Sequence, residues 1–196
     1  MAKISNPVVD MLLHSAQGFY SVGLQAASEV LKEDKIFGYQ ILAPAAVNFG
    51  FAIELFLKAL LLSTTKMQIE GHELLKLYKH LPEAVKVQIE SRYSKHISLD
   101  EDGKEIRSLK MVVYRGNQQK NPTTKSEDKS LKAILKKHNR TFDNWRYLYE
   151  VGEDGYELDI DFRSLHCLIK ALIETINATP RKHQFFIEPK PQPRPT

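Results

Sequence analysis

One apolar stretch constrains the fold of this chain more than any other feature. Between residues 45 and 62 almost every side chain is apolar, and the strongly polar interruptions are Asn48, Glu54 and Lys58. A helix that is apolar on all sides is buried either in a protein core or in a bilayer. Two charges near the middle of a membrane span would each cost roughly 2.5–3.5 kcal/mol. The stretch therefore predicts a helix over 43–64 at the centre of a helical core, and we expect no membrane association.

The rest of the chain supplies helices that can surround this central one. Asn6 suits an N-cap and Pro7 suits a first helical position, and apolar residues then recur at spacings of three and four to about residue 33. Further helical segments are predicted from Gly71 to Pro82, over 83–93, over 130–138, and from about 159–161 to 176. This pattern predicts an all-α protein, an up-and-down bundle of four or more helices, with residues 1–178 as a single domain.

Two weaker patterns interrupt the helices. Residues 111–114 favour a short strand, and Glu-Asp-Gly-Tyr at 153–156 favours a turn, so the sequence is consistent with a small β-hairpin insertion. Residues 116–129 read as a polar loop. Residues 179–196 hold five of the nine prolines, and they are predicted to form a disordered tail.

Composition excludes several classes of protein. Of 196 residues one is a cysteine, Cys167, so there is no disulfide framework and no cysteine-rich zinc site. The first residues lack an apolar run before a cleavage site, so we expect no signal peptide and a cytoplasmic location. No histidine spacing suits a metal, and no glycine-rich phosphate loop is present, so we expect neither a metal nor a cofactor.

Charge is distributed unevenly along the chain. The net charge is +4, yet residues 117–140 carry seven basic residues against two acids, and residues 141–162 carry one basic residue against seven acids. The two regions can be solvated faces that attract one another. Alternatively, the basic region contacts the phosphates of a nucleic acid or nucleotide.

The polar residues of the central helix are the first candidate binding residues. Asn48 is either a hydrogen-bonding link between helices or a ligand contact, since an unpaired buried amide costs about 1–3 kcal/mol. Glu54 and Lys58 have the spacing and order of an intrahelical ion pair, and on so apolar a helix such a pair must be matched or functional. His72 follows Gly71, where it opens the next helix or contacts a ligand.

A second candidate cluster lies further along the chain. Trp145, Arg146 and Tyr147 place an arginine between two aromatic residues, with Glu150 one helical turn after the arginine. Such a set can stack a base and hold a phosphate. It can equally lock the last helix with aromatic contacts and an ion pair.

Two Arg/His pairs are candidates for catalysis. Arg163 and His166 lie three apart on the last predicted helix, and Arg92 and His96 lie four apart. Histidine can act as a general acid or base near neutral pH, and arginine can stabilise a charged phosphorane during RNA cleavage. Either pair can instead be structural, as a half-buried histidine beside a surface arginine.

Three segments of the chain resemble the HEPN superfamily. They are the central helix from Asn48 to Leu61, the block Gly71-His72-Glu73-Leu74-Leu75, and the segment 142–150. These are small helical-bundle proteins of prokaryotic defence and toxin–antitoxin systems, and the resemblance covers roughly residues 5–178. It implies homodimers and binding of RNA or nucleotides. The residues that match recurrent positions are Asn48, Glu54, Lys58, His72, Trp145, Arg146 and Glu150, and Tyr147 is added as a stacking residue.

The resemblance is incomplete at the catalytic motif. Many members are metal-independent ribonucleases in which four to six residues separate an arginine from the histidine that follows it. In this chain three residues lie between Arg92 and His96 and two between Arg163 and His166, so neither pair has that spacing. We therefore expect a non-catalytic or atypical member that binds RNA or nucleotide, in phage defence or a toxin–antitoxin system. The alternatives are a ribonuclease with an atypical Arg/His site, and an interaction module that binds a protein partner encoded by a neighbouring gene.

Overall fold

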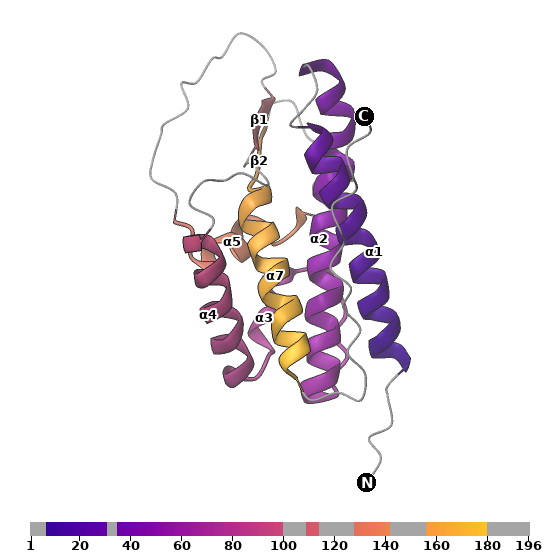
Figure 1. The fold of residues 1–196 in the computed structure, drawn as a ribbon, viewed down its shortest axis with the longest axis vertical. Coiled ribbons are helices and arrows are strands. Elements are labelled where there is room, and N and C mark those ends of the chain that lie inside the picture. The colour runs from indigo at the N-terminus through magenta and orange to yellow at the C-terminus, as the bar shows by residue number, and fades with distance from the viewer. Residues whose placement is uncertain (1–6, 31–34, 100–108, 114–127, 142–155, 180–196) are drawn as a thin grey trace.

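The structure is a computed structural model that describes residues 7–30, 35–99, 109–113, 128–141 and 156–179 (Figure 1). Its elements are α1 (Pro7–Val30), α2 (Lys35–Thr65), α3 (Leu74–Lys79), α4 (Glu83–Leu99), β1 (Leu109–Val113), α5 (Leu131–Lys137), β2 (Tyr156–Ile160) and α7 (Phe162–Ala178). The expected all-α helical bundle is confirmed. The segments 142–150 and 180–196, which carry the Trp145 cluster and most of the predicted tail, lie outside the described residues.

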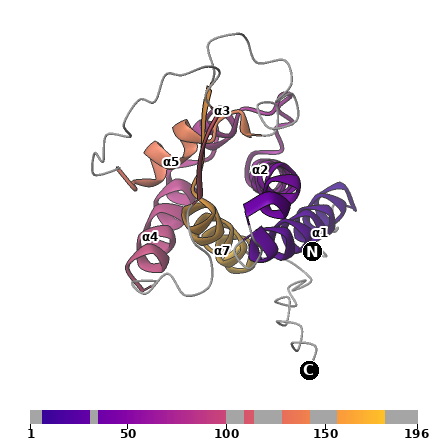
Figure 2. The same ribbon diagram turned by 90° about the horizontal axis from the view of Figure 1, so that it is seen from above.

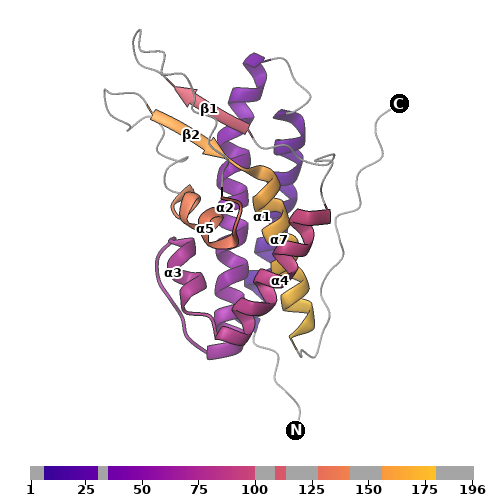
Figure 3. The ribbon, with the colours of Figure 1, turned by 90° about the vertical axis from the view of Figure 1, so that its left-hand side faces the viewer.

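Helix α2 is the centre of the bundle. It packs against α1 along its length and against α7 on another side, while α4 lies beyond α7 and α3 and α5 lie beside each other (Figures 1–3). Among the described helices, the segment Ile41–Thr65 is long and apolar enough to cross a membrane, with a mean hydropathy of 1.8, and 72% of it is buried inside the molecule. A core helix has this burial, as the sequence predicted.

Aromatic rings join the three central helices. The ring of Tyr20 on α1 meets that of Phe49 on α2 edge to face at 5.9 Å, and Phe49 meets Phe162 at the start of α7 at 5.4 Å. All three side chains are buried. Aromatic pairs in these geometries contribute about 0.5–1.5 kcal/mol beyond the area that they bury. This chain of rings fixes how α1, α2 and α7 lie relative to one another.

The central helix begins earlier than the sequence predicted. It starts at Lys35 instead of residue 43, so Pro44 lies inside the helix. Proline lacks an N–H group and removes one hydrogen bond from a helix interior. Leu42, Ala45 and Ala46 around it are buried. Packing in the core therefore outweighs the local cost of a proline inside the helix.

The next two helices also differ from the prediction at their ends. Helix α3 begins at Leu74, with Glu73 as its N-cap residue, so His72 lies in the connection before the helix and does not open it. Helix α4 continues to Leu99, beyond the predicted end at Tyr93. Its last turns contact α7 through Arg92 and His96. Both contacts are made with α7, which lies far along the sequence, so the local pattern of α4 does not reveal them.

The strands pair across a long sequence separation. β1 overlaps the strand predicted at 111–114, and it runs antiparallel to β2 with Leu109 opposite Ile160 and Val113 opposite Tyr156. The turn predicted at 153–156 falls mostly outside the described residues, and Tyr156 begins β2, whose partner is β1. The predictions for the last two helices are confirmed: α5 is capped by Ser130, and the Asp161 carboxylate caps α7 by accepting from the Ser164 N–H at 2.9 Å.

Helices α1 and α2 are in close contact at Gly23. A Cβ atom at this position would lie 3.0 Å from Cδ2 of Phe49, 3.1 Å from Cβ of Asn48 and 3.2 Å from the Phe49 backbone nitrogen. Gly18 lies on the same helix, and a Cβ atom there would have no neighbour within 4 Å. The two glycines therefore separate the cost of close packing from the ordinary cost of glycine in a helix.

We predict that Gly18→Ala raises the free energy of unfolding, whereas Gly23→Ala lowers it or leaves it unchanged. Alanine favours a helix over glycine by about 0.8–1 kcal/mol, so Gly18→Ala should raise the free energy of unfolding by up to that amount. At Gly23 the same gain is opposed by overpacking that costs about 1–3 kcal/mol. Urea denaturation should therefore find Gly23→Ala less stable than Gly18→Ala. Equal stabilities would show that the two helices can move apart at Gly23 without cost.

Candidate functional site

Glu54, Lys58 and His72 come together in one cluster. The Glu54 carboxylate is only 1% exposed, and the Lys58 ammonium donates to its Oε1 atom at 2.6 Å. Nδ1 of His72 lies 2.9 Å from Oε2 and 3.1 Å from Oε1. Because a carboxylate only accepts hydrogen bonds, Nδ1 carries a proton and donates it to both oxygens. Three of the predicted binding residues are thus joined in space.

This cluster keeps a charge inside an apolar core. A buried carboxylate costs several kcal/mol unless an opposite charge and hydrogen bonds offset that cost. Lys58 is partly exposed and His72 nearly half exposed, so the cluster leads from the core to the surface. The pairing of Glu54 with Lys58 follows from helical spacing. The contact with His72 closes the cluster from another segment of the chain.

The connection between α2 and α3 places His72. It contains Lys66 with φ of 59° and Gly71 with φ of +99°, two residues in the left-handed region of backbone conformation. Glycine adopts this conformation without steric cost, whereas lysine does so at a cost. The backbone thus turns sharply at each end of the connection. These turns return His72 to α2, eighteen residues after Glu54 in the sequence.

Asn48 has a local partner. Its Nδ2 atom donates to the backbone oxygen of Pro44 at 2.7 Å, one helical turn earlier. Its Cβ atom also lies against the close approach of α1 at Gly23. These contacts support the structural interpretation of Asn48, in which its amide is satisfied by its own helix.

A basic surface lies on α3, on α5 and on Arg140, which follows α5. Its exposed members are Lys76, Lys79, Lys132, Lys136, Lys137 and Arg140. Within the described part of the chain, the ammonium groups of Lys76, Lys79, Lys132 and Lys136 form no ion pair. Exposed lysines on adjoining helices, without acidic partners, raise the local positive potential. Part of the basic region predicted from the sequence is therefore a surface shared by two helices.

Three contacts hold the two halves of the basic surface together. Asn139 accepts from the N–H of Leu74 through its backbone oxygen at 3.2 Å, and from the N–H of Leu75 through Oδ1 at 2.8 Å. The Arg140 guanidinium lies 2.9 Å from Oε1 of Glu73. The first turn of α3 is thus satisfied by the segment that follows α5, so the two helices have a fixed relative position (Figure 3).

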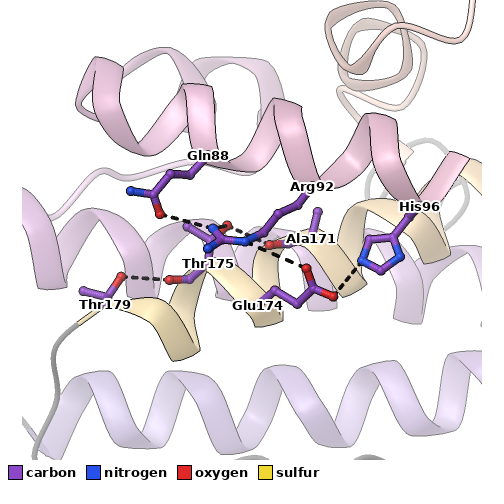
Figure 4. Close-up of polar contacts among 7 residues, drawn as sticks. All are labelled: Gln88, Arg92, His96, Ala171, Glu174, Thr175 and Thr179. Carbon is purple, nitrogen blue, oxygen red and sulfur yellow. Dashed lines mark hydrogen bonds and ion pairs between the residues drawn. The ribbon is translucent and has the colours of Figure 1, made fainter. Parts of the chain in front are cut away.

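Arg92 and His96 share a carboxylate on α7 (Figure 4). Nε2 of His96 lies 2.9 Å from Oε1 of Glu174, and Nε of Arg92 lies 3.8 Å from its Oε2 atom. The Arg92 guanidinium also donates to Oγ1 of Thr175 at 2.8 Å and to Oε1 of Gln88 at 3.1 Å. The arrangement brings an arginine, a histidine and a carboxylate together, and Arg92 and His96 are both partly exposed.

His166 lies in the core and Arg163 at its margin. His166 is 8% exposed, and its Nδ1 atom lies 2.8 Å from the hydroxyl of Tyr20 on α1. The bond joins α1 to α7 inside the aromatic chain described above. This location favours a structural role for His166, as a link between two helices. Of the two Arg/His pairs, the one at Arg92 is the more accessible.

Sequence reasoning missed the partners of these residues. Glu174 and Tyr20 on distant helices, and Asn139 in the turn after α5, each complete a cluster, and nothing in their local sequence marks them. The spacing of Glu174 on the last helix places it off the apolar stripe, which indicates exposure but no partner. The cluster of Trp145, Arg146, Tyr147 and Glu150 lies outside the described residues, and its predicted role stays a prediction.

Comparisons with models of known families, with curated proteins and with solved structures gave no match. Within the residues that the structure describes, no group of three or more His, Cys, Asp or Glu side chains is placed to hold a metal ion.

We predict that Lys58→Met lowers the free energy of unfolding by about 1–3 kcal/mol, because it removes a charged hydrogen bond from a buried carboxylate. The double variant Glu54→Met, Lys58→Met should recover most of that loss, since apolar side chains often replace a buried ion pair without cost. Urea denaturation of both variants measures the difference. A double variant less stable than Lys58→Met would show that Glu54 stabilises the fold through other contacts.

Proposed function

We propose that this protein is a HEPN-like helical bundle that binds RNA through the basic surface on α3 and α5. The proposal extends to a role in phage defence or a toxin–antitoxin system, which rests on the resemblance described above. The observation that carries RNA binding is the placement of exposed lysines on two adjoining helices. Phosphate contacts of this kind supply most of the sequence-independent affinity for nucleic acids.

The geometry of the basic surface suits an extended polyanion. Lys132 and Lys136 are one helical turn apart, about 6 Å along α5, and Lys76 and Lys79 lie on the adjoining helix. Successive phosphates of a single strand are separated by distances of the same order. Lysine ammonium groups act as flexible point charges, so they tolerate many phosphate positions and carry little sequence information.

The cluster of Glu54, Lys58 and His72 lies behind the connection that leads into this surface, and helps to fix its position. His72 lies two residues before Leu74, the first residue of α3. Its contact with Glu54 attaches the connection between α2 and α3 to α2. Lys58 neutralises the carboxylate that would otherwise repel an approaching phosphate. Glu54, Lys58 and His72 are thus proposed to position the basic surface.

We predict that Lys132→Glu with Lys136→Glu weakens binding of a fluorescent single-stranded RNA of about 20 nucleotides by tenfold or more at low salt. Each phosphate contact contributes about 0.7 to the slope of log affinity against log salt for a single strand. The slope between about 50 and 200 mM salt should therefore become shallower by one to two. Fluorescence anisotropy across that salt series measures both quantities.

Lys95→Glu is the matched control, because Lys95 is exposed on α4 outside the basic surface. It makes the same charge change per residue, so it should leave both affinity and slope nearly unchanged. Equal losses from Lys95→Glu would show a response to net charge alone. If a mononucleotide competed as effectively as RNA does, the ligand would be a nucleotide and not the polymer. Affinity independent of salt would overturn the proposal.

The contact of Arg92 and His96 with Glu174 favours a second function, metal-independent RNA cleavage. A carboxylate that accepts from Nε2 of His96 leaves Nδ1 as the nitrogen that can receive a proton. Arg92 lies beside it as the group that can stabilise negative charge on a phosphorus centre. This pair retains the residue types of the superfamily's catalytic motif at a shorter spacing.

If this second function holds, His96→Ala should reduce RNA cleavage by about 10²–10⁴-fold, the usual contribution of a general acid or base. Cleavage should be unaffected by EDTA, since no metal takes part. His14→Ala, which removes an exposed histidine on α1, is the control. Cleavage that survives His96→Ala, or that EDTA abolishes, would exclude Arg92 and His96 as the site.

A further inference from the structure

A group of polar side chains is buried where α5 meets α7 and α4, and neither function proposed above uses it. His138 and Thr141 follow α5 and are 2% and 3% exposed, and Asp161, which caps α7, is 1% exposed. A buried polar group without a partner costs about 1–3 kcal/mol, so the hydrogen bonds of this group matter for the fold. They also show which protonation state of the histidine the junction requires.

The ring of His138 is neutral in this arrangement. Its Nε2 atom accepts from the backbone N–H of Asp161 at 3.4 Å, so that nitrogen carries no proton. The ring proton then lies on Nδ1, which donates to Oγ1 of Thr141 at 3.3 Å, and that hydroxyl donates to the backbone oxygen of His138 at 3.0 Å. A second proton on the ring would turn Nε2 into a donor that faces another donor. The contact with α7 is thus available only to the neutral ring.

The charged group closest to this contact is the carboxylate of Asp161. It accepts from the N–H of Ser164 at 2.9 Å and from its hydroxyl at 2.8 Å. This carboxylate attracts an imidazolium, but the attraction draws the ring toward oxygens that Ser164 already uses and does not restore the bond to the N–H. The other titratable groups at the junction are Tyr93 on α4 and Cys167 on α7. Burial raises the pKa of Tyr93, so it adds no charge.

The groups on the solvent side of the junction do not favour a further positive charge. Lys137 on α5 is exposed, and Arg163 on α7 is partly exposed. The remaining charges are those of Arg140 and of Glu73, just before α3, which pair with each other at 2.9 Å. The pair is neutral as a whole, and the two other cations repel an imidazolium. A proton on His138 is therefore opposed by its surroundings as well as by the N–H of Asp161.

The position of His138 connects this junction to the basic surface. The next residue, Asn139, accepts from the N–H groups of Leu74 and Leu75 and so holds α3 against the segment after α5. At its other end α5 is attached through Lys129, whose backbone oxygen accepts from the hydroxyl of Tyr93 at 3.0 Å. The contact of His138 is thus the polar attachment of residues 138–141 to α7. Without it, α5 and its lysines lose their fixed position beside α3.

We propose that His138 is a pH-sensitive link, whose neutral ring holds residues 138–141 against α7 and whose protonation releases them together with α5. A released ring takes up a proton below about pH 6.5, whereas the docked ring does not. The docked arrangement is therefore fully stable above that pH and becomes less stable as the pH falls. For a single proton the equilibrium shifts by at most about tenfold per pH unit.

The link regulates RNA binding, and this part of the inference rests on the function proposed above. His72 and His80 are exposed beside the lysines of α3. Their protonation adds positive charge, so by itself it should raise the affinity for RNA as the pH falls. Release of α5 acts in the opposite direction, because it separates the two halves of the basic surface. Native affinity should therefore fall by about threefold or more between about pH 6.5 and 5.5, within the limit for one proton.

H138Q tests the link without removing the acceptor. The amide oxygen of glutamine can accept the N–H of Asp161 near the place of Nε2, and it does not titrate in this range. Hydrogen exchange of residues 131–137, without RNA, measures release directly. Between about pH 6.5 and 5.5, native protection corrected for the intrinsic rate should fall by up to about tenfold relative to H138Q. Protection in α5 should stay below that in α2, because one segment is released and the bundle is not unfolded.

H80Q is the matched control, because His80 is an exposed histidine at the end of α3. It should keep the native pH dependence of α5. If H138Q folds poorly, an NMR titration of the native histidine rings replaces it, and the ring of His138 should take up its proton at a lower pH than that of His80. Equal pH dependence of α5 protection in native protein and H138Q, or equal titration of the two rings, would overturn the link.

RNA affinity separates the link from its regulatory effect. In H138Q the affinity should rise as the pH falls from about 6.5 to 5.5, whereas in the native protein it should fall. A rise in both proteins, although α5 is released, would overturn the regulation of binding. If no RNA bound at any pH, the function proposed above would be wrong, and hydrogen exchange would still decide whether His138 is the link.

Discussion

The burial of α2 between α1 and α7 is the constraint on which the rest of the structure depends. Each Å² of apolar helix surface that is removed from water stabilises the folded state by about 25 cal/mol. Because α2 is apolar on nearly all sides, one neighbour cannot cover it, and the chain places helices on several sides. The steric fit at Gly23 and the rings of Tyr20, Phe49 and Phe162 then select one arrangement of those helices.

Several polar groups enter this core together with hydrogen-bonding or charged partners. Glu54 is matched by Lys58 and His72, Tyr20 by His166, and Asp161 accepts from the hydroxyl of Ser164 at 2.8 Å as well as from its N–H. The Lys58 contact lies within α2, the His72 contact joins α2 to the connection that follows it, the Tyr20–His166 contact joins α1 to α7, and the Asp161 contacts cap α7. An apolar core alone specifies the helices loosely, whereas hydrogen-bonded partners add directional constraints. The candidate sites thus lie where these constraints reach the surface.

Sequence reasoning found what depends on local spacing. The Glu54–Lys58 pair, the start of α1 at Pro7, and helices that begin near residue 130 and near residue 161 follow from local spacing. It failed where a distant segment decides. The contact of His72 with Glu54 requires left-handed backbone at Lys66, which a lysine gives no reason to expect. The end of α4 depends on Glu174, and the partner of β2 is a strand that the turn signal at 153–156 did not indicate.

The arrangement of the bundle keeps the proposed RNA-binding surface away from the packing of α1 on α2. The basic surface lies on α3 and α5, and α1 lies on the other side of α2 (Figure 2). The contacts of Asn139 with Leu74 and Leu75 join α3 to the segment after α5, so the lysines of the two helices keep one relative position without help from α1. If RNA binds there as proposed, a strand that contacts both helices makes each additional phosphate contact on the same polymer. Such contacts add affinity without base readout, because phosphates carry no sequence information.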